Sequence, residues 1–175
     1  GQIIKNPTGI NTSATVFINN GIPAAERVFL ARHPFQMHPV NPNELYYASG
    51  ARIYKTTNGG NFWQAMAAIP NVSVLEVDLN DPNFVYAASW DQQGNWAFWR
   101  SEDAGVNWAL SQQFPGWRVT DIESDPNNPG IVYATRNSAF PNNPHVYKST
   151  DWGNTWTGIQ GDLPDITVNA IAVNA

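Results

Sequence analysis

The sequence contains no cysteine and little charge, and these gaps already exclude several classes of protein. Without cysteine there is no disulfide framework and no thiolate metal site, which excludes zinc ribbons and thiol redox centres. Charged residues make up 13% of the 175 residues, and nine scattered lysines and arginines stand against 14 acidic residues. A net charge of −5 without any basic run argues against a nucleic-acid partner.

Long apolar runs are missing as well. No stretch of about 18 apolar residues occurs, so we predict no membrane span. Residues 1–11 lack the basic start and the apolar core of a signal peptide. The chain begins with Gly1 rather than Met, which we interpret as a processed chain, an excised segment or a part of a larger protein.

Aromatic residues, glycine and proline are abundant. The sequence holds 8 Trp, 6 Tyr and 8 Phe, together with 13 Gly and 13 Pro, so bulky side chains alternate with chain breakers at short intervals. A hydrophobic fraction of 42% is too high for a disordered chain. The composition therefore favours one domain's worth of short strands over long helices.

An eight-residue pattern, S/T-x-D/N-x-G-x-x-W, occurs three times, at residues 56–63, 101–108 and 149–156. We call these segments octets. They start 45 and 48 residues apart, which is the length of a propeller-blade repeat. The four shared positions are Thr56, Asn58, Gly60 and Trp63 in the first octet, Ser101, Asp103, Gly105 and Trp108 in the second, and Ser149, Asp151, Gly153 and Trp156 in the third.

Further features recur in the same order before each octet. A turn containing proline lies at residues 41–43, 81–83 and 125–127, and an aliphatic residue with a tyrosine follows each turn. Alternating apolar runs precede the second and third turns. Four short strands in about 45 residues is the content of one blade. The sequence therefore predicts an all-β fold, a β-propeller or propeller segment of four-stranded antiparallel blades.

We place complete blades at residues 28–67, 72–112 and 117–160, a partial blade at 1–27, and the opening strand of a further blade at 166–175. One alternative is a closed ring in which strands from both termini share a blade. The other, which we favour, is a segment of a larger ring, because the sequence ends where the next proline turn is expected.

The octet pattern has a structural interpretation. An Asp or Asn oxygen accepts N–H groups of the turn, the glycine adopts positive φ, and the tryptophan packs between sheets. The octet residues are therefore expected to hold blades together. Trp152 stands where the other octets have Gly59 and Ala104, and we expect its side chain to be exposed.

These octets resemble the Asp-box, or BNR repeat, of sialidases, xyloglucan-cleaving glycosidases, sortilin-type receptors, photosystem assembly-factor propellers and many secreted bacterial surface proteins. The resemblance covers about residues 35–160 and is specific for the repeat, not for one activity. Residues 163–173 also resemble the blade-opening strand of secreted bacterial repeat proteins. The resemblance implies a protein that is secreted or displayed on the cell surface.

The loop between the second and third strands of each blade varies most. It is nearly absent in the first blade and longer in the next two, and aromatic residues gather on the same side: Trp90, Trp96, Trp117 and Phe140. Flat rings beside amides are a common sugar-binding surface, so these four residues are candidate ligand-binding residues. The alternative is that the rings belong to the blade cores.

For catalysis, glycosidic cleavage needs one carboxylic acid and a second carboxylate. Glu76 and Asp121 are the best pair, because we place them at equivalent positions on channel-facing strands of adjacent blades. Either residue can equally be a solvated channel residue. The Arg-Ile-Pro motif of sialidases has no match, since residues 21–23 read Gly-Ile-Pro.

No metal or cofactor is predicted. His33, His38 and His145 lack metal-ligand spacing with an acidic partner, and solvated loop histidines are the simpler interpretation. Our leading hypothesis is a non-catalytic extracellular recognition or assembly module that binds glycan or protein through its variable loops. The alternatives are a fragment of a propeller glycoside hydrolase with catalytic residues elsewhere, and a building block of an extracellular polymer. Further blades of a larger protein, or self-assembly, are possible partners.

Overall fold

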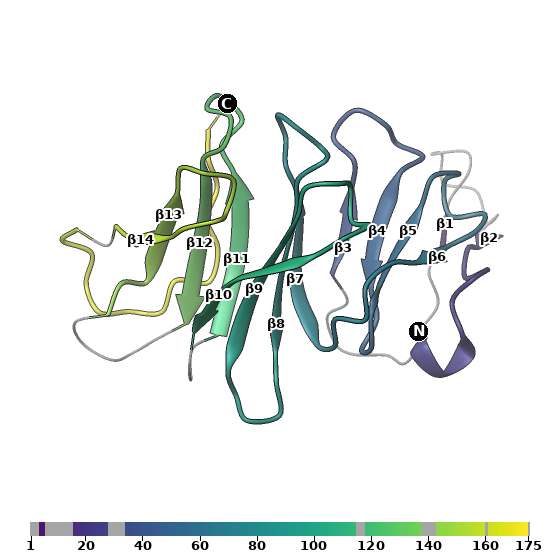
Figure 1. Ribbon diagram of the computed structural model, residues 1–175, viewed down its shortest axis with the longest axis horizontal. Coiled ribbons are helices and arrows are strands. Elements are labelled where there is room, and N and C mark those ends of the chain that lie inside the picture. The colour runs from purple at the N-terminus through teal and green to yellow at the C-terminus, as the bar shows by residue number, and fades with distance from the viewer. Residues whose placement is uncertain are drawn as a thin grey trace.

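The computed structural model describes residues 4–5, 16–27, 34–114, 118–137, 143–159 and 161–174. Three four-stranded antiparallel sheets stand side by side along the long axis (Figure 1). This arrangement confirms the predicted all-β class and the four-stranded blade. Among the described residues the one helical turn is η1 (Ala24–Glu26).

Each blade is one sheet with its strands in sequence order. The first blade holds β3 (Phe35–Met37), β4 (Leu45–Ala48), β5 (Ile53–Thr56) and β6 (Gln64–Ala65). The second holds β7 (Val72–Val77), β8 (Val85–Trp90), β9 (Trp96–Ser101) and β10 (Ala109–Phe114). The third holds β11 (Arg118–Ser124), β12 (Val132–Asn137), β13 (Val146–Ser149) and β14 (Thr157–Gly158). The short strands β1 (Ile4–Lys5) and β2 (Val16–Phe17) pair separately.

One side-chain acceptor opens the turn after the first strand of each blade. Asp78 Oδ1 accepts the backbone N–H groups of Asn80 and Asp81 at 2.9 and 3.1 Å. Asp125 Oδ1 accepts the two equivalent N–H groups at 3.0 and 3.1 Å. In the first blade His38 Nδ1 takes this place, at 3.2 and 3.1 Å, so that nitrogen carries no proton. His38 is therefore part of a turn and not a freely solvated histidine.

The proline turn of the third blade lies at residues 128–130, three residues later than the predicted 125–127. The carbonyl of Asn128 accepts the N–H of Ile131 at 3.1 Å, the bond that closes the corresponding turn in the other two blades. The sequence offers two prolines here, and the earlier one follows Asp125, which is the side-chain acceptor described above.

Each octet docks on the proline turn of its own blade. The backbone N–H of the fourth octet residue donates to a turn carbonyl: Gly59 to Asn43 at 2.9 Å, Ala104 to Asn83 at 2.8 Å, and Trp152 to Gly130 at 3.0 Å. Octets and proline turns therefore share one edge of the molecule, which we call the octet edge. The β4–β5 and β8–β9 hairpins lie at the opposite edge, the hairpin edge (Figure 1).

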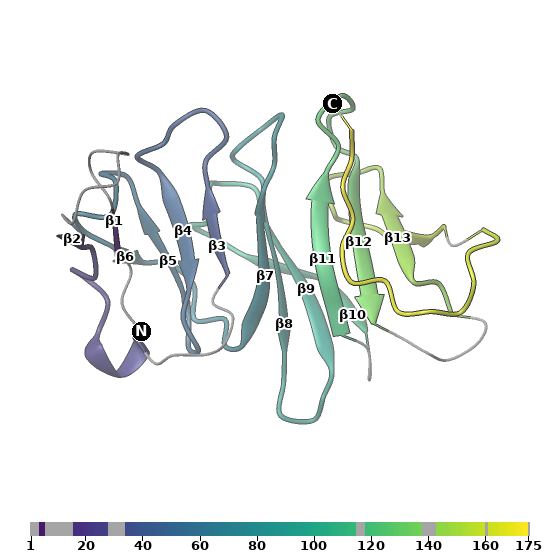
Figure 2. The ribbon, with the colours of Figure 1, turned by 180° about the vertical axis from the view of Figure 1, so that it is seen from behind.

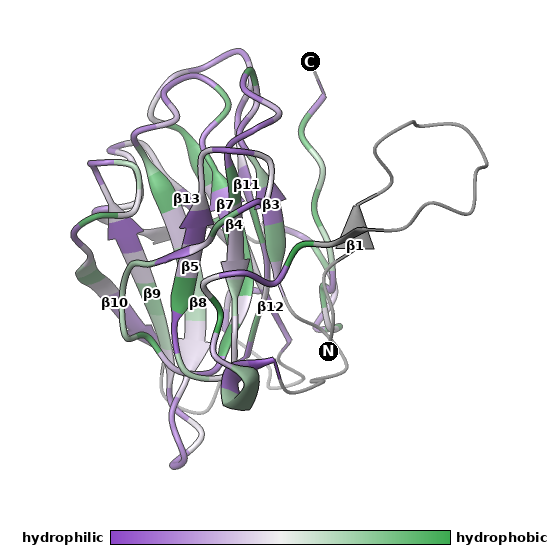
Figure 3. Cartoon of the chain, turned by 90° about the vertical axis from the view of Figure 1, so that its right-hand side faces the viewer, coloured by the Kyte–Doolittle hydropathy of each residue, from purple (hydrophilic) through white to green (hydrophobic). Residues whose placement is uncertain are grey.

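The core lies mainly between neighbouring sheets. One buried cluster joins the first and second blades, a second joins the second and third, and a third joins the first blade to residues 18–22. Trp63 is fully buried in that third cluster, where its indole N–H donates to the carbonyl of Ile18 at 2.7 Å. In Figure 3 the hydrophobic colour is concentrated in the strands and the loops at both edges are mostly hydrophilic.

The C-terminal segment, residues 161–174, runs beside the first strand of the third blade (Figure 2). Thr120 Oγ1 donates to the carbonyl of Val168 at 2.7 Å, and the N–H of Ile171 donates to Asp121 Oδ2 at 3.1 Å. Among the described residues this segment forms no strand and belongs to none of the sheets.

Candidate functional site

Trp90 and Trp96 form the last residue pair of the β8–β9 hairpin, at the hairpin edge. The Trp90 side chain is 42% exposed, and its carbonyl accepts the Asn71 side-chain N–H at 3.1 Å. Trp96 is half-buried against the cluster between the second and third blades, on the strand face that also carries Phe98. The two predicted binding rings therefore differ: Trp90 is open to solvent, whereas Trp96 is largely part of the core.

The loop that joins these strands, residues 91–95, is held by one carboxylate. Asp91 accepts the side-chain N–H of Asn95 at 2.9 Å and the backbone N–H groups of Asn95 and Gln93 at 2.8 and 2.9 Å. The Asn95 bonds are the main cause that lowers the pKa of Asp91. The loop beside Trp90 is thus preorganised by its own hydrogen bonds and presents amides at its surface.

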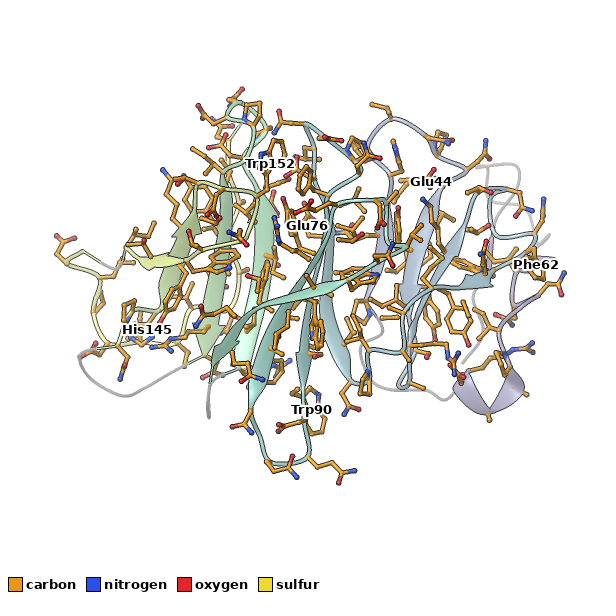
Figure 4. The ribbon with its side chains drawn as sticks, viewed as in Figure 1. Glu44, Phe62, Glu76, Trp90, His145 and Trp152 are labelled. Carbon is orange, nitrogen blue, oxygen red and sulfur yellow. The ribbon has the colours of Figure 1, made fainter. Side chains whose placement is uncertain are left out.

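Trp117 and Phe140, the other two candidate binding residues, lie outside the described residues. Figure 4 labels Trp90 at the hairpin edge and Trp152 near the octet edge. Of the four candidate binding residues, Trp90 is therefore the one whose ring the described structure shows exposed at the surface.

The first strands of the three blades carry a chain of polar side chains. Glu76, on β7, is 6% exposed; Gln36 Nε2 donates to its Oε2 at 2.5 Å, and Ser124 Oγ donates to its Oε1 at 3.4 Å. Burial, and then the nearby negative charges of Glu123 and Asp121, raise the pKa of Glu76 to about 8. Glu76 thus holds its proton at neutral pH, inside the contact of three blades.

The predicted equivalence of Glu76 and Asp121 is wrong. In the strand registers Glu76 lies opposite Tyr86, and the residue opposite the matching Tyr133 is Glu123. Asp121 instead lies opposite Thr135. The sequence comparison missed Glu123, although the tyrosine that follows each proline turn was a sufficient marker for the alignment.

Asp121 is occupied with backbone contacts. Its Oδ1 accepts the N–H of Ile122 at 3.1 Å and its Oδ2 accepts the N–H of Ile171 at 3.1 Å. The carboxylate therefore fastens the C-terminal segment to β11. Catalysis by Glu76 and Asp121 remains a hypothesis, and the contacts of both residues give each of them a structural role.

The octets form the hydrogen bonds that their pattern predicts. Ser101 Oγ donates to Asp103 Oδ1 at 2.9 Å and accepts the N–H of Gly105 at 2.8 Å. Asp103 accepts the backbone and side-chain N–H groups of Asn107 at 2.8 and 2.7 Å. The first and third octets repeat this network, with Asn58 and Asp151 as acceptors.

Trp152 is not the exposed residue that we predicted. Its φ is 57°, in the left-handed region, and its ring stacks on Phe84 of the second blade with centroids 4.3 Å apart and planes 16° apart. The indole also covers Gly130. The side chain is half-buried and joins two blades.

His145 is completely buried, and its Nε2 lies 3.6 Å from Asp165 Oδ1. The prediction that His145 is a solvated loop histidine is therefore wrong. His33 lies outside the described residues.

An open groove of about 520 Å³ lies at the rim of the second blade, lined by Arg100, Glu102, Asp103, Asn107, Trp108 and Ala109.

Within the part of the chain that the structure describes, no group of three His, Asp or Glu side chains is placed to hold a metal ion. In the same residues no helix is long and apolar enough to cross a membrane.

No family model matches the sequence. Among curated proteins, it is 28% identical to the xyloglucanase Xgh74A of Acetivibrio thermocellus over an alignment of 162 residues, covering 70% of this chain and 19% of the relative. A xyloglucanase of a Paenibacillus species is also 28% identical, with 70% of this chain and 16% of the relative covered. The chain spans less than one fifth of the length of these relatives.

Among solved structures, a GH74 enzyme from Niastella koreensis matches with a TM-score of 0.59 and 21% identity, over 74% of this chain and 22% of that one. YCF48 bound to D1 peptide matches with a TM-score of 0.52 and 14% identity, over 71% and 38% of the two chains. At these identities the likeness concerns the fold alone. The chain is a β-propeller segment whose sequence is similar to part of the propeller xyloglucanases.

Proposed function

We propose that these blades are part of a xyloglucanase-like propeller that degrades a β-glucan outside the cell, with its catalytic carboxylates outside residues 1–175. The observation that carries this proposal is the 28% identity with curated xyloglucanases along 70% of the chain. It favours the hydrolase alternative over the non-catalytic module that the loops alone suggested.

The contribution that we assign to this segment is a sugar contact at the hairpin edge. Trp90 offers a ring that is 42% exposed, and the adjoining loop, which Asp91 holds by hydrogen bonds, carries the exposed side chains of Gln92 and Gln93. The apolar face of a glucose unit stacks on such a ring while amides bind its hydroxyl groups. The polar loop around one aromatic ring supports a glucan subsite there.

We further assign the octets as Asp-box turns. Their repeated Ser/Thr and Asp/Asn hydrogen bonds and their glycines at positive φ support this assignment. Their role is structural, because each octet binds its own proline turn and the second and third octets also contact the preceding blade.

The proposal is tested with the protein as its gene encodes it, using xyloglucan oligosaccharides in calorimetry and initial-rate hydrolysis assays. Trp90→Ala should raise KM about fivefold with kcat little changed, because one stacking contact contributes about 1 kcal/mol. Phe62→Ala is the matched control, since Phe62 is a 52% exposed ring in an octet. Its KM should equal that of the wild type.

Thermal unfolding separates binding from folding. Both variants should unfold within about 0.5 kcal/mol of the wild type, because both side chains are exposed. Absence of both xyloglucan hydrolysis and xyloglucan binding in the wild type would refute the proposal. If the wild type hydrolyses xyloglucan and Trp90→Ala has an unchanged KM, only the assignment of the sugar subsite to Trp90 would be contradicted.

A second candidate is a recognition module for an extended peptide, without catalysis. The exposed Trp90 ring favours this candidate, because an aromatic ring can pack against an apolar peptide side chain as well as against a sugar. Under this candidate the wild type binds peptides from a library, the Trp90 ring serves as an apolar contact, and no β-glucan is cleaved. The polymer building-block hypothesis predicts neither ligand and instead predicts assembly in light scattering.

A further inference from the structure

A paired tyrosine and basic residue on each blade receives the octet of the next blade. On the first blade, Tyr46 lies opposite Lys55. Tyr46 Oη and Lys55 Nζ both donate to the carbonyl of Ala104, the fourth octet residue of the second blade, at 3.0 and 3.2 Å. The next residue, Gly105, lies so close to the Tyr46 ring that an added Cβ would be 3.1 Å from Cε1.

The same contact joins the second blade, which carries the tyrosine and the basic residue, to the octet of the third blade. Tyr86 lies opposite Arg100, whose guanidinium donates to the carbonyl of Trp152 at 3.3 Å. Gly153 lies on the Tyr86 ring, where an added Cβ would be 3.2 Å from Cε1. In both interfaces the basic residue thus binds the carbonyl of the fourth octet residue, and the tyrosine ring packs against the glycine at the fifth position.

The third blade carries the same pair. Tyr133 lies opposite Lys148, whose Nζ is 5.6 Å from the ring centroid. Tyr46 and Tyr86 are both 0% exposed beneath the following octet, whereas Tyr133 and Lys148 are only half-buried. Among the described residues no octet covers this third pair.

We propose that Tyr133 and Lys148 bind the octet turn of a further blade of the same polypeptide. Lys148 Nζ donates to the carbonyl of the fourth residue of that octet, and the glycine at its fifth position lies on the Tyr133 ring. The interface continues the two that already join the three blades, with a cation facing a backbone carbonyl each time. This inference rests on the repeat geometry and not on the proposed substrate.

The structure favours the same polypeptide over a second copy. In the first blade the glycine face of the octet is already covered, because an added Cβ at Gly60 would be 2.4 Å from Ile18 Cδ1. The N–H of Trp63 also donates to the carbonyl of Asn20 at 2.8 Å. A second copy would have to displace these residues before its first octet could reach Lys148.

The C-terminal segment supports the same choice. The first strands β7 and β11 pack beside one another, and residues 168–174 run along the next position, fastened to Asp121 and Thr120. Asn127 Nδ2 donates to the carbonyl of Asn174 at 3.0 Å. The segment therefore occupies the place of the opening strand of the next blade, on the flank that carries Tyr133 and Lys148.

Lysine labelling tests the proposal directly, because the sequence contains three lysines: Lys5, Lys55 and Lys148. The gene-encoded protein is treated with an amine-acylating reagent, and each modified site is measured by mass spectrometry against the same chain in denaturant. Lys55, which an octet already covers, is the internal reference. We expect the acylation of Lys148 to be about tenfold slower in the folded protein than in the denatured chain, a protection as strong as that of Lys55.

A dilution series identifies the source of the octet. Protection of Lys148 that does not change on dilution supports a blade of the same polypeptide. Protection that is lost on dilution would mean a second copy and would overturn our choice. Rapid labelling of Lys148 with Lys55 still protected would overturn the whole proposal. Because no glucan is added, each outcome is independent of xyloglucan activity.

Discussion

At the scale of single residues, Glu76 is the side chain whose chemistry the fold changes most. Its pKa lies near 8 in the folded chain because burial, and then the charge of Glu123, penalise ionisation, whereas its ordinary value is 4.5. Between these two values the folded state binds a proton that the unfolded state releases. Stability therefore falls as pH rises through this window.

We expect the free energy of unfolding to drop by on the order of 3 kcal/mol between pH 5 and pH 8 because of Glu76. Glu76→Gln should remove most of this slope, since the amide keeps the partners Gln36 and Ser124 without a titrating proton. Urea unfolding at several pH values measures it. A variant with the same slope as the wild type would show that another group titrates.

Residue identities alone predicted part of this site. The sequence indicated that acids line the first strands, but it paired Glu76 with Asp121, and the register pairs it with Glu123. The chain offers two prolines after β11, and taking the earlier one as the turn shifts the comparison. Burial is also a tertiary property, because the Glu76 neighbours Gln36 and Ser124 lie on other blades.

At the scale of elements, the octet is a turn closed by its own side chains. The backbone N–H of Asn107, together with its side chain, lowers the pKa of Asp103 below the ordinary value. The first octet has Asn58 at this position with the same backbone bond, at 2.9 Å to Phe62. An amide oxygen therefore satisfies the turn as well as a carboxylate does.

Asp103→Asn should leave stability at pH 7 nearly unchanged, whereas Asp103→Ala should lower it by about 1 kcal/mol, because the Asn107 N–H and the Ser101 hydroxyl lose their acceptor. Since the native pKa is depressed, the wild type loses this contribution as pH falls through that pKa, and Asp103→Asn should not. Thermal unfolding at pH 7 and pH 3 tests both statements. Equal costs for the two substitutions would contradict the acceptor role.

At the scale of the whole molecule, the question is whether Glu76 and Asp121 perform catalysis. Glu76 is enclosed by three blades and Asp121 binds the N–H of Ile171, so the contacts of both side chains give each of them a structural role. We expect the double variant Glu76→Gln and Asp121→Asn to keep the xyloglucan-hydrolysing activity of the gene-encoded protein. The measurement is kcat at a temperature where both proteins are folded.

A loss of kcat by several orders of magnitude, with the fold intact by circular dichroism, would instead place catalysis on this pair. If the double variant loses its activity because it unfolds, the single variants distinguish the loss of a catalytic group from the loss of the fold. Asp121→Asn keeps an acceptor oxygen for Ile171 and should fold normally.

The sequence by itself determined the repeat, the strand order and the octet turns, because these depend on period-two alternation, proline turns and glycine at positive φ over a few residues. Only the tertiary structure decided which residues face one another across blades. Trp152 is half-buried because Phe84 of another blade lies beneath it, and Tyr133 is half-open because no octet covers it among the described residues. Contacts between blades join residues that are far apart in the sequence, by 40 positions for Gln36 and Glu76 and by 58 for Tyr46 and Ala104. Over such separations the local pattern carries no information on burial.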